Sequence, residues 1–378
     1  MGNVPHLRFP EFTEEWKETK LGKIAEITKG SGISKDRLSE YGSPCILYGE
    51  LYTKYKSEII NEVYSRTELD SSLLVKSKAN DVIIPCSGET AIDISTARCV
   101  PFNNILLGGD LNIIRLKNND GGFFAYQLNG TRKKDIARVA QGVSVVHLYG
   151  ENLKHIRVYH PAIEEQKKIT RLLSLIDKRI ATQNKIIEDL KKLKSAISLK
   201  MLHSDSWEQF KIQDIASIGR GRVISSVEIS QQENPLYPVY SSQTSNDGIM
   251  GYLDDFMFEG EYISWTTDGA NAGTVFYRNG KFNCTNVCGL LKLKKGFDAH
   301  FVSLVLAEAT RMYVSTNLAN PKLMNNTMGN IQIRLPKLEE QKRISVVFRK
   351  LHGLLETHNS LIIKYSKQKQ YLLSQMFI

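Results

Sequence analysis

The chain has 378 residues, of which 42% are hydrophobic, so it can form two or three domains with ordinary cores and is not a disordered protein. Its 50 lysines and arginines outnumber its 40 aspartates and glutamates, and the net charge of +10 favours a polyanionic partner such as nucleic acid. No apolar run is long enough to span a membrane and the N-terminus lacks an apolar signal region, so we expect no membrane association and a cytoplasmic location.

In chain order, the first distinctive segment begins at Trp16 and returns 191 residues later at Trp207. The first copy reads W-K-E-T-K-L-G-K-I-A-E-I-T-K-G, and the second reads W-E-Q-F-K-I-Q-D-I-A-S-I-G-R-G. The tryptophans, the I-A-x-I segment and the final glycines, Gly30 and Gly221, coincide. The repeat indicates two copies of one domain.

Each copy continues with short β-branched runs between clusters of Gly, Asn, Asp and Ser, a pattern that predicts twisted sheets. The dipeptide Asn279-Gly280 predicts a hairpin turn. Short helices are also expected, so each domain mixes α and β structure. The expected strands are Asp81–Pro85, Leu111–Leu116, Tyr262–Trp265, Thr274–Tyr277 and Gly289–Leu293, and the expected helices are Gly122–Gly130 and Ala299–Tyr313.

A second repeat begins at Pro161 and returns 175 residues later at Pro336, where P-A-I-E-E-Q-K-K-I becomes P-K-L-E-E-Q-K-R-I. Both copies continue with apolar residues at heptad spacing over about five heptads, which predicts two helices roughly 60 Å long. The core positions are Ile169, Ile176, Gln183, Leu190 and Ile197 with Leu173, Ile180, Ile187, Lys194 and Met201, and then Ile344, Leu351, His358, Tyr365 and Leu372 with Phe348, Leu355, Ile362, Lys369 and Met376.

The polar exceptions in this seam match between the copies, because Gln183 corresponds to His358 and Lys194 to Lys369. We expect the helices to pair as an antiparallel coiled coil, with Gln183 near His358 and the two termini of the chain close together. The alternative is an ordinary surface helix of a bundle. The predicted fold is α+β, a pseudo-two-fold tandem duplication with similar mixed α/β globular domains at 1–160 and 204–335 and long antiparallel helices at 161–203 and 336–378.

The segments that most resemble known catalytic motifs each lack a required residue. The segment Asn234-Pro235-Leu236-Tyr237 is the nearest approach to the active loop of amino-methyltransferases, and Leu236 spoils the match. The segment Gly219-Arg220-Gly221-Arg222 lacks the third glycine of a nucleotide-binding fingerprint. We therefore expect no catalytic site in this chain.

The five cysteines are an odd number without a C-x-x-C pair, which favours a reduced protein. Cys284 and Cys288 are expected to share one face of a strand as small buried hydrophobic residues. A zinc site is disfavoured because histidine partners are not nearby. The sequence therefore implies no metal.

Polar loops lie at matching places in both copies, and their residue types can read base edges or hold phosphates. A solvated loop is the alternative for any single residue, but the repeated set in a basic protein favours DNA. The candidate contacts are Lys29, Ser31, Ser34, Lys35, Lys54, Ser87, Gln141 and Ser144 in the first copy, and Arg220, Arg222, Ser242, Gln243, Asn246, Thr266, Asn271, Asn317, Lys322 and Asn325 in the second.

The long helices also carry apolar residues beside the seam. This stripe is wider than a two-stranded coil buries, and it suits a bundle of more than two helices. Helices of another protein are therefore expected to cover it. The candidate partner-binding residues are Leu172, Ile186, Leu193, Val347, Leu354 and Ile363.

With its P-x-[IL]-E-E-Q-K-[KR]-I segments and its Trp…I-A-x-I…Gly starts, the chain resembles the specificity (S) subunit of type I restriction-modification systems over nearly all its length. The resemblance implies two target recognition domains that each bind half of a bipartite double-stranded DNA site, and helices that set the spacing. It also implies that two modification subunits dock on the helices and that restriction subunits, with the translocase and nuclease, join them.

On this resemblance the chain itself binds no cofactor, and S-adenosylmethionine, ATP and Mg are expected in the partner subunits. The protein is then expected in the cytoplasm of a bacterium or archaeon, associated with the nucleoid. Two other functions are weighed against this one. They are a stand-alone DNA-binding regulator or architectural protein, which would need no modification subunit, and a coiled-coil scaffold, which would not bind DNA.

Overall fold

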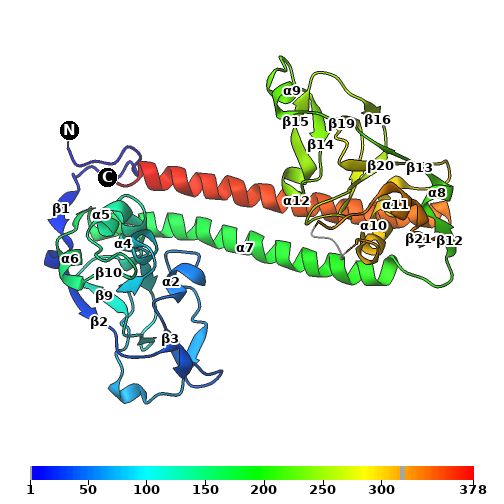
Figure 1. Cartoon of the computed structure of the whole chain (residues 1–378). Coiled ribbons are helices and arrows are strands. Elements are labelled where there is room, and N and C mark those ends of the chain that lie inside the picture. The colour runs from blue at the N-terminus through cyan, green and yellow to red at the C-terminus, as the bar shows by residue number, and fades with distance from the viewer. Residues whose placement is uncertain (1, 316–319) are drawn as a thin grey trace. The chain divides into compact units, whose positions relative to one another are not determined.

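The structure is a computed structural model that describes residues 2–315 and 320–378 (Figure 1). The chain divides into two compact units, unit 1 with residues 1–185 and 358–378, and unit 2 with residues 186–357. The long helices α7 (Ile163–Met201) and α12 (Leu338–Gln375) each contribute one half to each unit. Both units combine strands with helices, which confirms the predicted α+β class.

Each unit contains a four-stranded antiparallel sheet with the same strand order. The inner strand β5 (Asp81–Pro85) is buried along its whole length, which explains its run of apolar residues. The order is β2 (Ala25–Lys29), β9 (Leu111–Leu116), β5 (Asp81–Pro85) and β7 (Arg98–Val100) in unit 1, and β13 (Ala216–Arg220), β20 (Cys288–Leu293), β17 (Tyr262–Thr266) and β18 (Val275–Arg278) in unit 2.

A second sheet in each unit contains one parallel pair of strands, β3 (Ser43–Ile46) with β8 (Leu106–Leu107) in unit 1 and β14 (Tyr237–Tyr240) with β19 (Lys281–Cys284) in unit 2. These sheets are β4 (Ser65–Thr67), β3 (Ser43–Ile46) and β8 (Leu106–Leu107), and then β15 (Ile249–Leu253), β14 (Tyr237–Tyr240), β19 (Lys281–Cys284) and β16 (Phe258–Glu259). The two-stranded pairs are β1 (Lys17–Lys20) with β11 (Arg157–His160), β6 (Ser87–Gly88) with β10 (Val146–His147), and β12 (Glu208–Lys211) with β21 (Gln332–Leu335).

The remaining helices are short. They are α1 (Leu21–Ile24), α2 (Glu50–Thr53), α3 (Ala91–Ile94), α4 (Gly121–Asn129), α5 (Lys133–Arg138), α6 (Gly150–Lys154), α8 (Ile212–Ile215), α9 (Ser226–Ser230), α10 (Ala299–Ala309) and α11 (Asn325–Asn330), with 3-10 turns at 35–37, 71–73, 245–248 and 310–312. The predicted strands β5 and β9 have the expected bounds, and β17, β18, β20 and α4 lie within one residue of theirs. Helix α10 begins where predicted and ends in a 3-10 turn.

The hairpin predicted at Asn279-Gly280 is wrong. The chain does turn there, with Gly280 at a φ of 100°, but β18 pairs with β17 whereas β19 pairs with β14 and β16 in the other sheet. The apolar side chain of Phe282 is buried against Phe258 of that second sheet and Tyr262 of the first. The turn therefore carries the chain from one sheet to the other.

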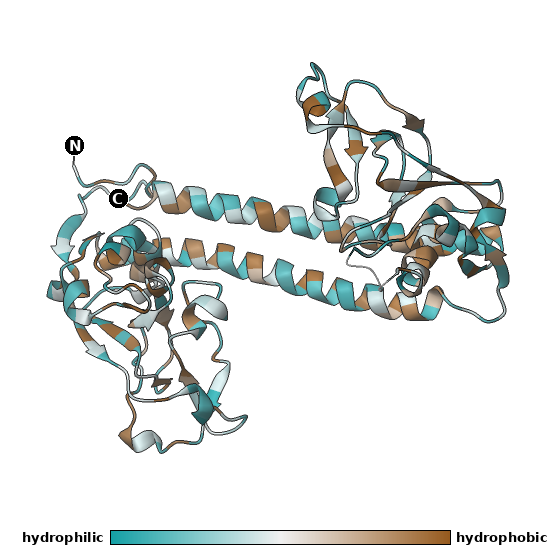
Figure 2. Cartoon of the chain, in the orientation of Figure 1, coloured by the Kyte–Doolittle hydropathy of each residue, from teal (hydrophilic) through white to brown (hydrophobic). Residues whose placement is uncertain are grey.

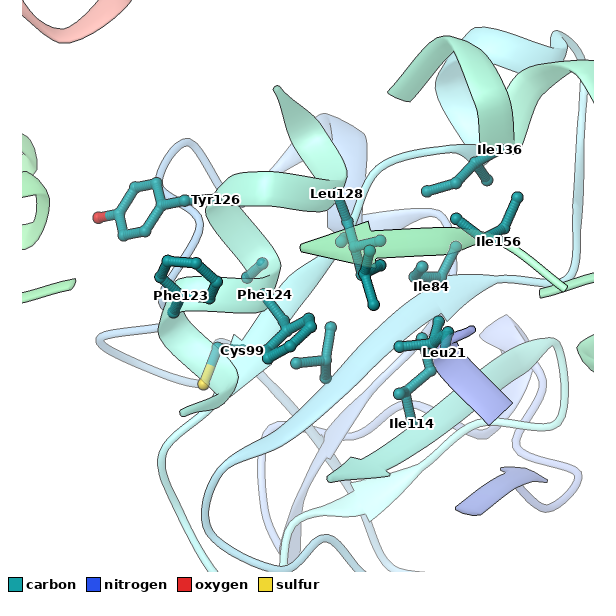
Figure 3. Packing of buried hydrophobic residues seen from close by; sticks show 14 of the residues in the cluster. Leu21, Ile84, Cys99, Ile114, Phe123, Phe124, Tyr126, Leu128, Ile136 and Ile156 are labelled. Atoms are coloured by element: carbon teal, nitrogen blue, oxygen red, sulfur yellow. The ribbon is translucent and has the colours of Figure 1, made fainter. Parts of the chain in front are cut away.

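The core of unit 1 lies where the four-stranded sheet meets α4 and the long helices. In Figure 3, Ile84 and Ile114 of the sheet face Phe124 and Leu128 of α4. The hydroxyl of Tyr126 points away from this aliphatic cluster, and it donates a hydrogen bond of 2.7 Å to the Asp177 carboxylate of α7. The first globular domain is thus attached to the long helix by polar as well as apolar contacts.

The antiparallel pairing of the long helices is confirmed within each unit. In unit 1, Ile169 at the start of α7 shares a core with Leu372 at the end of α12, and in unit 2 Leu202 follows the end of α7 and shares a core with Ile344 near the start of α12. Apolar and polar turns alternate along both helices in Figure 2. His358 and Gln183, the matching polar residues of the two repeats, meet at 2.6 Å.

The chain termini lie close together within unit 1, as predicted. The amide of Leu7 donates a hydrogen bond of 2.9 Å to the carbonyl oxygen of Gln375, at the end of α12 (Figure 1). Phe377 also packs on Trp16, with their ring centroids 6.2 Å apart. The C-terminal segment therefore completes the core that the N-terminal strand begins.

The other polar exceptions in the seam, Lys369 and Lys194, differ between the units. The half-buried Lys369 side chain places its ammonium between the buried carboxylates of Glu58 and Asp177, at 2.5 and 2.7 Å. Burial raises the pKa of Glu58, and the Lys369 charge opposes that shift. Lys194 forms no ion pair with any residue that the structure describes, so only one of the two equivalent lysines is paired.

The E-E-Q motif explains how each domain is fixed to its helix. The buried amide of Gln166 accepts a hydrogen bond of 2.9 Å from the Asp120 backbone N–H and donates one of 2.9 Å to the carbonyl oxygen of Pro161. Gln341 repeats both bonds with Asp298 and Pro336, at 3.0 and 2.8 Å. Asp120 and Asp298 are the N-cap residues of α4 and α10.

We predict that Gln341→Ala lowers the free energy of unfolding by about 1–3 kcal/mol, because it leaves the Asp298 N–H and the Pro336 carbonyl without their partner. Urea unfolding followed by circular dichroism measures the effect. Gln368→Ala, at an exposed position of the same helix, is the matched control and should change stability by less than about 0.5 kcal/mol. Equal losses in both variants would contradict the role of the motif.

Candidate nucleic-acid interface

In unit 2, the loops that follow β13, β14, β17 and β19 meet at one end of the two sheets. The Ser242 hydroxyl lies 3.2 Å from the Asp268 carboxylate and donates to the carbonyl oxygen of Val287. The amide of Gly269 donates to the carbonyl oxygen of Pro321 at 3.1 Å. We call this surface loop cluster 2, and it consists of residues 220–222, 241–246, 266–274, 285–287 and 321–325.

Two arginines of loop cluster 2, Arg220 and Arg222, are each held by hydrogen bonds to different partners. The Arg220 guanidinium donates to the Asn325 side chain at 2.9 Å and to the carbonyl oxygen of Asn286 at 3.3 Å, which joins three loops. The exposed Arg222 pairs with Glu228, and this hydrogen bond raises the pKa of Arg222. Guanidinium groups held in this way are suited to phosphate oxygens and to guanine edges.

The repeated glycines, Gly30 and Gly221, mark the places where two backbones cross. A Cβ atom on Gly221 would lie 1.6 Å from the carbonyl oxygen of Cys284, and one on Gly30 would lie 1.9 Å from that of Gly108. In unit 2, the end of β13 therefore passes directly over the end of β19. In unit 1, the end of β2 passes directly over the segment after β8. Only glycine allows this close approach, and the approach brings the loops together.

Unit 1 builds an equivalent surface, which we call loop cluster 1. The amide of Ser31 donates to the carbonyl oxygen of Leu107, and the amide of Gly108 donates to that of Ile46, both at 2.9 Å. Ser87 lies opposite His147 in the β6–β10 pair, and the backbone of His147 is also bonded to that of Gln141. Loop cluster 1 consists of residues 29–31, 46–49, 86–88, 107–110 and 141–148.

The candidate residues are brought together in part. Loop cluster 1 includes Lys29, Ser31, Ser87, Gln141 and Ser144, and loop cluster 2 includes all the second-copy candidates except Asn317, which lies outside the described residues. Ser34 and Lys35 belong to the neighbouring 3-10 turn at 35–37. The side chains of Lys29, Lys35, Gln141, Ser144, Asn271 and Lys322 are exposed.

Several other candidates are engaged inside the protein. The Ser31 hydroxyl accepts a hydrogen bond from the Val75 amide at 2.8 Å, and Lys54 is paired with the buried carboxylate of Glu50 at 2.7 Å. Thr266 is buried, and its hydroxyl accepts from the amide of Thr274 at 3.0 Å. The side-chain amides of Gln243 and Asn246 both donate to the carbonyl oxygen of Ile249. These side chains shape the loops.

Sequence reasoning did not select the segments 107–110 and 285–287, which lie at the centre of the two clusters. Asn286 and Val287 contribute backbone carbonyls that bind Arg220 and Ser242. The one available signal was Thr285-Asn286, a polar pair between two apolar strands. Backbone acceptors leave no trace in residue type, so the central position of these segments could not be predicted.

The five cysteines are free, as expected of a reduced protein, and all are buried, which was predicted for Cys284 and Cys288. The prediction that Cys284 and Cys288 share a strand is wrong, because Cys284 ends β19 and Cys288 begins β20, so a turn separates them. Burial raises the pKa of the Cys45 and Cys86 thiols to about 11 and that of Cys99 to about 12. Within the described ranges, no group of three or more His, Cys, Asp or Glu residues could hold a metal ion.

The apolar stripe on the long helices is exposed to different degrees. Leu193, Leu354 and Ile363 are 48%, 47% and 56% exposed, whereas the other candidates, Leu172, Ile186 and Val347, are half-buried. Leu172 packs on the core of unit 1. None of the helices in the described residues has the length and apolar character that a membrane crossing needs.

The family model of the type I restriction modification DNA specificity domain matches the chain twice, over residues 13–192 and 204–364. The chain belongs to this family. The putative type I specificity subunit S.MpnORF201P of Mycoplasma pneumoniae is 35% identical over 233 residues, which cover 60% of this chain and 97% of that protein. The type I restriction enzyme MpnII specificity subunit of the same organism is 41% identical over 177 residues, which cover 45% of this chain and 53% of that subunit.

The fold agrees with this membership. The crystal structure of the S subunit of a type I restriction-modification system from M. genitalium matches with a TM-score of 0.75 at 17% identity, covering 99% of both chains. The chain is thus a DNA-recognising specificity subunit of a type I restriction-modification system and has no catalytic activity of its own. A stand-alone regulator is not favoured.

We predict that Gly221→Ala destabilises the protein by about 1–3 kcal/mol and weakens DNA recognition, because the added methyl group forces the β13 and β19 backbones apart. Thermal unfolding and DNA binding measure the two effects. Gly219→Ala is the matched control, because its Cβ meets no atom within 4 Å. If Gly219→Ala proved as harmful as Gly221→Ala, the crossing would not be the cause.

Proposed function

We propose that the chain reads a bipartite double-stranded DNA site, one half with loop cluster 1 and the other with loop cluster 2. The supporting observation is that one scaffold occurs twice, with the same sheet order and the same glycine crossing, and each copy ends in polar loops. The net charge of +10 supplies a sequence-independent attraction to phosphates.

Within each cluster, the exposed and engaged candidates have different roles. Lys29, Lys35 and Lys322 are suited to phosphate contacts, because their ammonium groups are exposed. Asn271 and Gln141 carry exposed amides of the kind that bind adenine edges in the major groove. Thr266 and Ser31 act indirectly by holding the loops that present these side chains.

The proposal extends to the partners and the location. Two modification subunits dock on the apolar stripe of the long helices, restriction subunits join them, and S-adenosylmethionine, ATP and Mg are bound in those subunits. The complex is then associated with the nucleoid, where its DNA lies. The exposed leucines and isoleucine of the stripe support such docking, because exposed apolar patches are typical of interaction sites.

We predict that Asn271→Ala, in the complex with modification subunits, relaxes one half of the recognised site and leaves the other half unchanged. The loss should be about 1–3 kcal/mol for the affected half-site, as for one lost bidentate contact. Mapping of methylated sites in genomic DNA measures it. Asn279→Ala is the matched control, because Asn279 is also exposed but lies at the opposite end of β18. Relaxation of both halves by Asn271→Ala would contradict independent reading.

We also predict that the double variant Leu193→Glu, Leu354→Glu no longer binds the modification subunit, because each leucine buried in a helix bundle contributes about 1.5–3 kcal/mol. Co-purification and sedimentation measure the loss. Both leucines are about half exposed, so the fold should persist, which Leu172→Glu would not guarantee. Leu73→Glu, at an exposed position outside the helices, should leave the complex intact. Retained binding by the double variant would exclude the stripe as the docking site.

A further inference from the structure

Unit 2 contains an open hollow of about 1030 Å³ beside the start of α12. Its walls come from the end of α7, from β12 with the residue before it, and from the first turns of α12. Trp207 and Val347 supply apolar walls, and Glu340 and Arg343 supply opposite charges. The hollow lies away from loop cluster 2 and shares no residue with it.

Unit 1 has the same elements at the equivalent place. The two repeats relate Trp207 to Trp16, Glu340 to Glu165, Arg343 to Lys168 and Val347 to Leu172. The adjoining strand pairs have the same register, because Lys17 lies opposite His160 and the corresponding residues, Glu208 and Leu335, lie opposite each other. The two places can therefore be compared residue by residue.

In unit 1 this place is filled by an N-terminal arm, residues 2–15. Arg8 binds Glu165 through two hydrogen bonds of 2.8 and 2.7 Å, and the Trp16 indole N–H lies 3.4 Å from the same carboxylate. Lys168 pairs with Glu11 and lies 4.4 Å from the centre of the Phe9 ring. The arm thus offers an arginine to Glu165 and a carboxylate and two aromatic rings to Lys168, and Phe9 also packs on the core that contains Trp16.

In unit 2 the chain provides no such arm. Leu202, the counterpart of Phe377, is followed by only His203–Ser206 before Trp207, whereas residues 2–15 precede Trp16. Trp16 is 2% exposed, but Trp207 is only half-buried. The Glu340 carboxylate is exposed and has no hydrogen-bond or ion-pair partner in residues 2–315 and 320–378. Unit 2 therefore has side chains that match those that bind the arm in unit 1, but it has no segment that corresponds to the arm.

We propose that this hollow binds an extended segment of a partner protein that carries an arginine followed by aromatic and acidic residues, as Arg8-Phe9-Pro10-Glu11-Phe12 does in unit 1. Glu340 receives the guanidinium group and Arg343 the carboxylate, while an aromatic ring packs against Trp207 and Val347. We infer this ligand because Glu340 and Arg343 have the same charges as Glu165 and Lys168, which pair with Arg8 and Glu11 of the arm. A second copy of this chain is a poorer donor, because its own arm is already bound to Glu165 and Gln375.

The test uses the full chain and a fluorescently labelled peptide with the sequence of residues 2–15. We expect saturable binding by fluorescence anisotropy, weakened about tenfold or more by Arg8→Ala in the peptide or by Glu340→Ala in the protein, as for a lost charge-assisted pair. Glu356→Ala is the matched control on the same helix, because Glu356 is exposed and lies outside the hollow, and it should bind like the wild type.

Three outcomes would overturn the proposal. The first is no binding, and the second is binding that survives Glu340→Ala but is lost in Glu165→Ala, which would mean that the peptide displaces the arm in unit 1. The third is self-association of the full chain that requires Arg8, which would make a second copy the occupant. The inference does not depend on the DNA-reading proposal, because Glu340→Ala lies outside both loop clusters and should leave the methylated sequence unchanged.

Discussion

The antiparallel seam between α7 and α12 is the interaction on which both units depend, because each helix completes a core at both of its ends. Leu372, Met376 and Phe377 of the second repeat are buried in unit 1, and Leu202, which follows α7, is buried in unit 2. Unit 1 has no complete core in one continuous stretch of chain, because residues 358–378 belong to it, whereas unit 2 is continuous over residues 186–357. Unit 1 therefore needs the last twenty or so residues before its N-terminal strand can bury Trp16.

The polar residues at core positions of the helix pair contribute to its register and do not add to its apolar contact area. A polar residue at a core position costs stability but disfavours other registers. Gln183 and His358 meet each other in the antiparallel register that the structure shows. Lys369 has a different role, because breaking a buried ion pair leaves an uncompensated charge. It attaches the C-terminal helix to Glu58 of the first domain.

The sequence predicted the elements whose signal is local. Strands β5 and β9 combine apolar runs with clear turn residues, and the long helices have a repeating heptad, so their bounds follow from pattern alone. The hairpin at Asn279-Gly280 failed because the turn residues fix only the local bend, whereas burial of Phe282 selects the sheet in which β19 pairs. The candidate site residues were harder to predict than these elements. In the sequence, Ser31 and Lys29 are both polar loop residues. The structure distinguishes them, because the Ser31 hydroxyl is bonded to the Val75 amide and so supports the fold.

The two units share a scaffold and differ in what they present at its end. Gly30 and Gly221 hold equivalent loops in place, but the residues beside them differ, since Lys29 corresponds to Arg220 and Ser31 to Arg222. A lysine offers a compact charge, whereas an arginine offers a planar fork that can bind guanine through two hydrogen bonds. On the proposed function, the same geometry therefore carries two different chemistries, and the two halves of the DNA site differ in sequence even though the domains that read them are repeats.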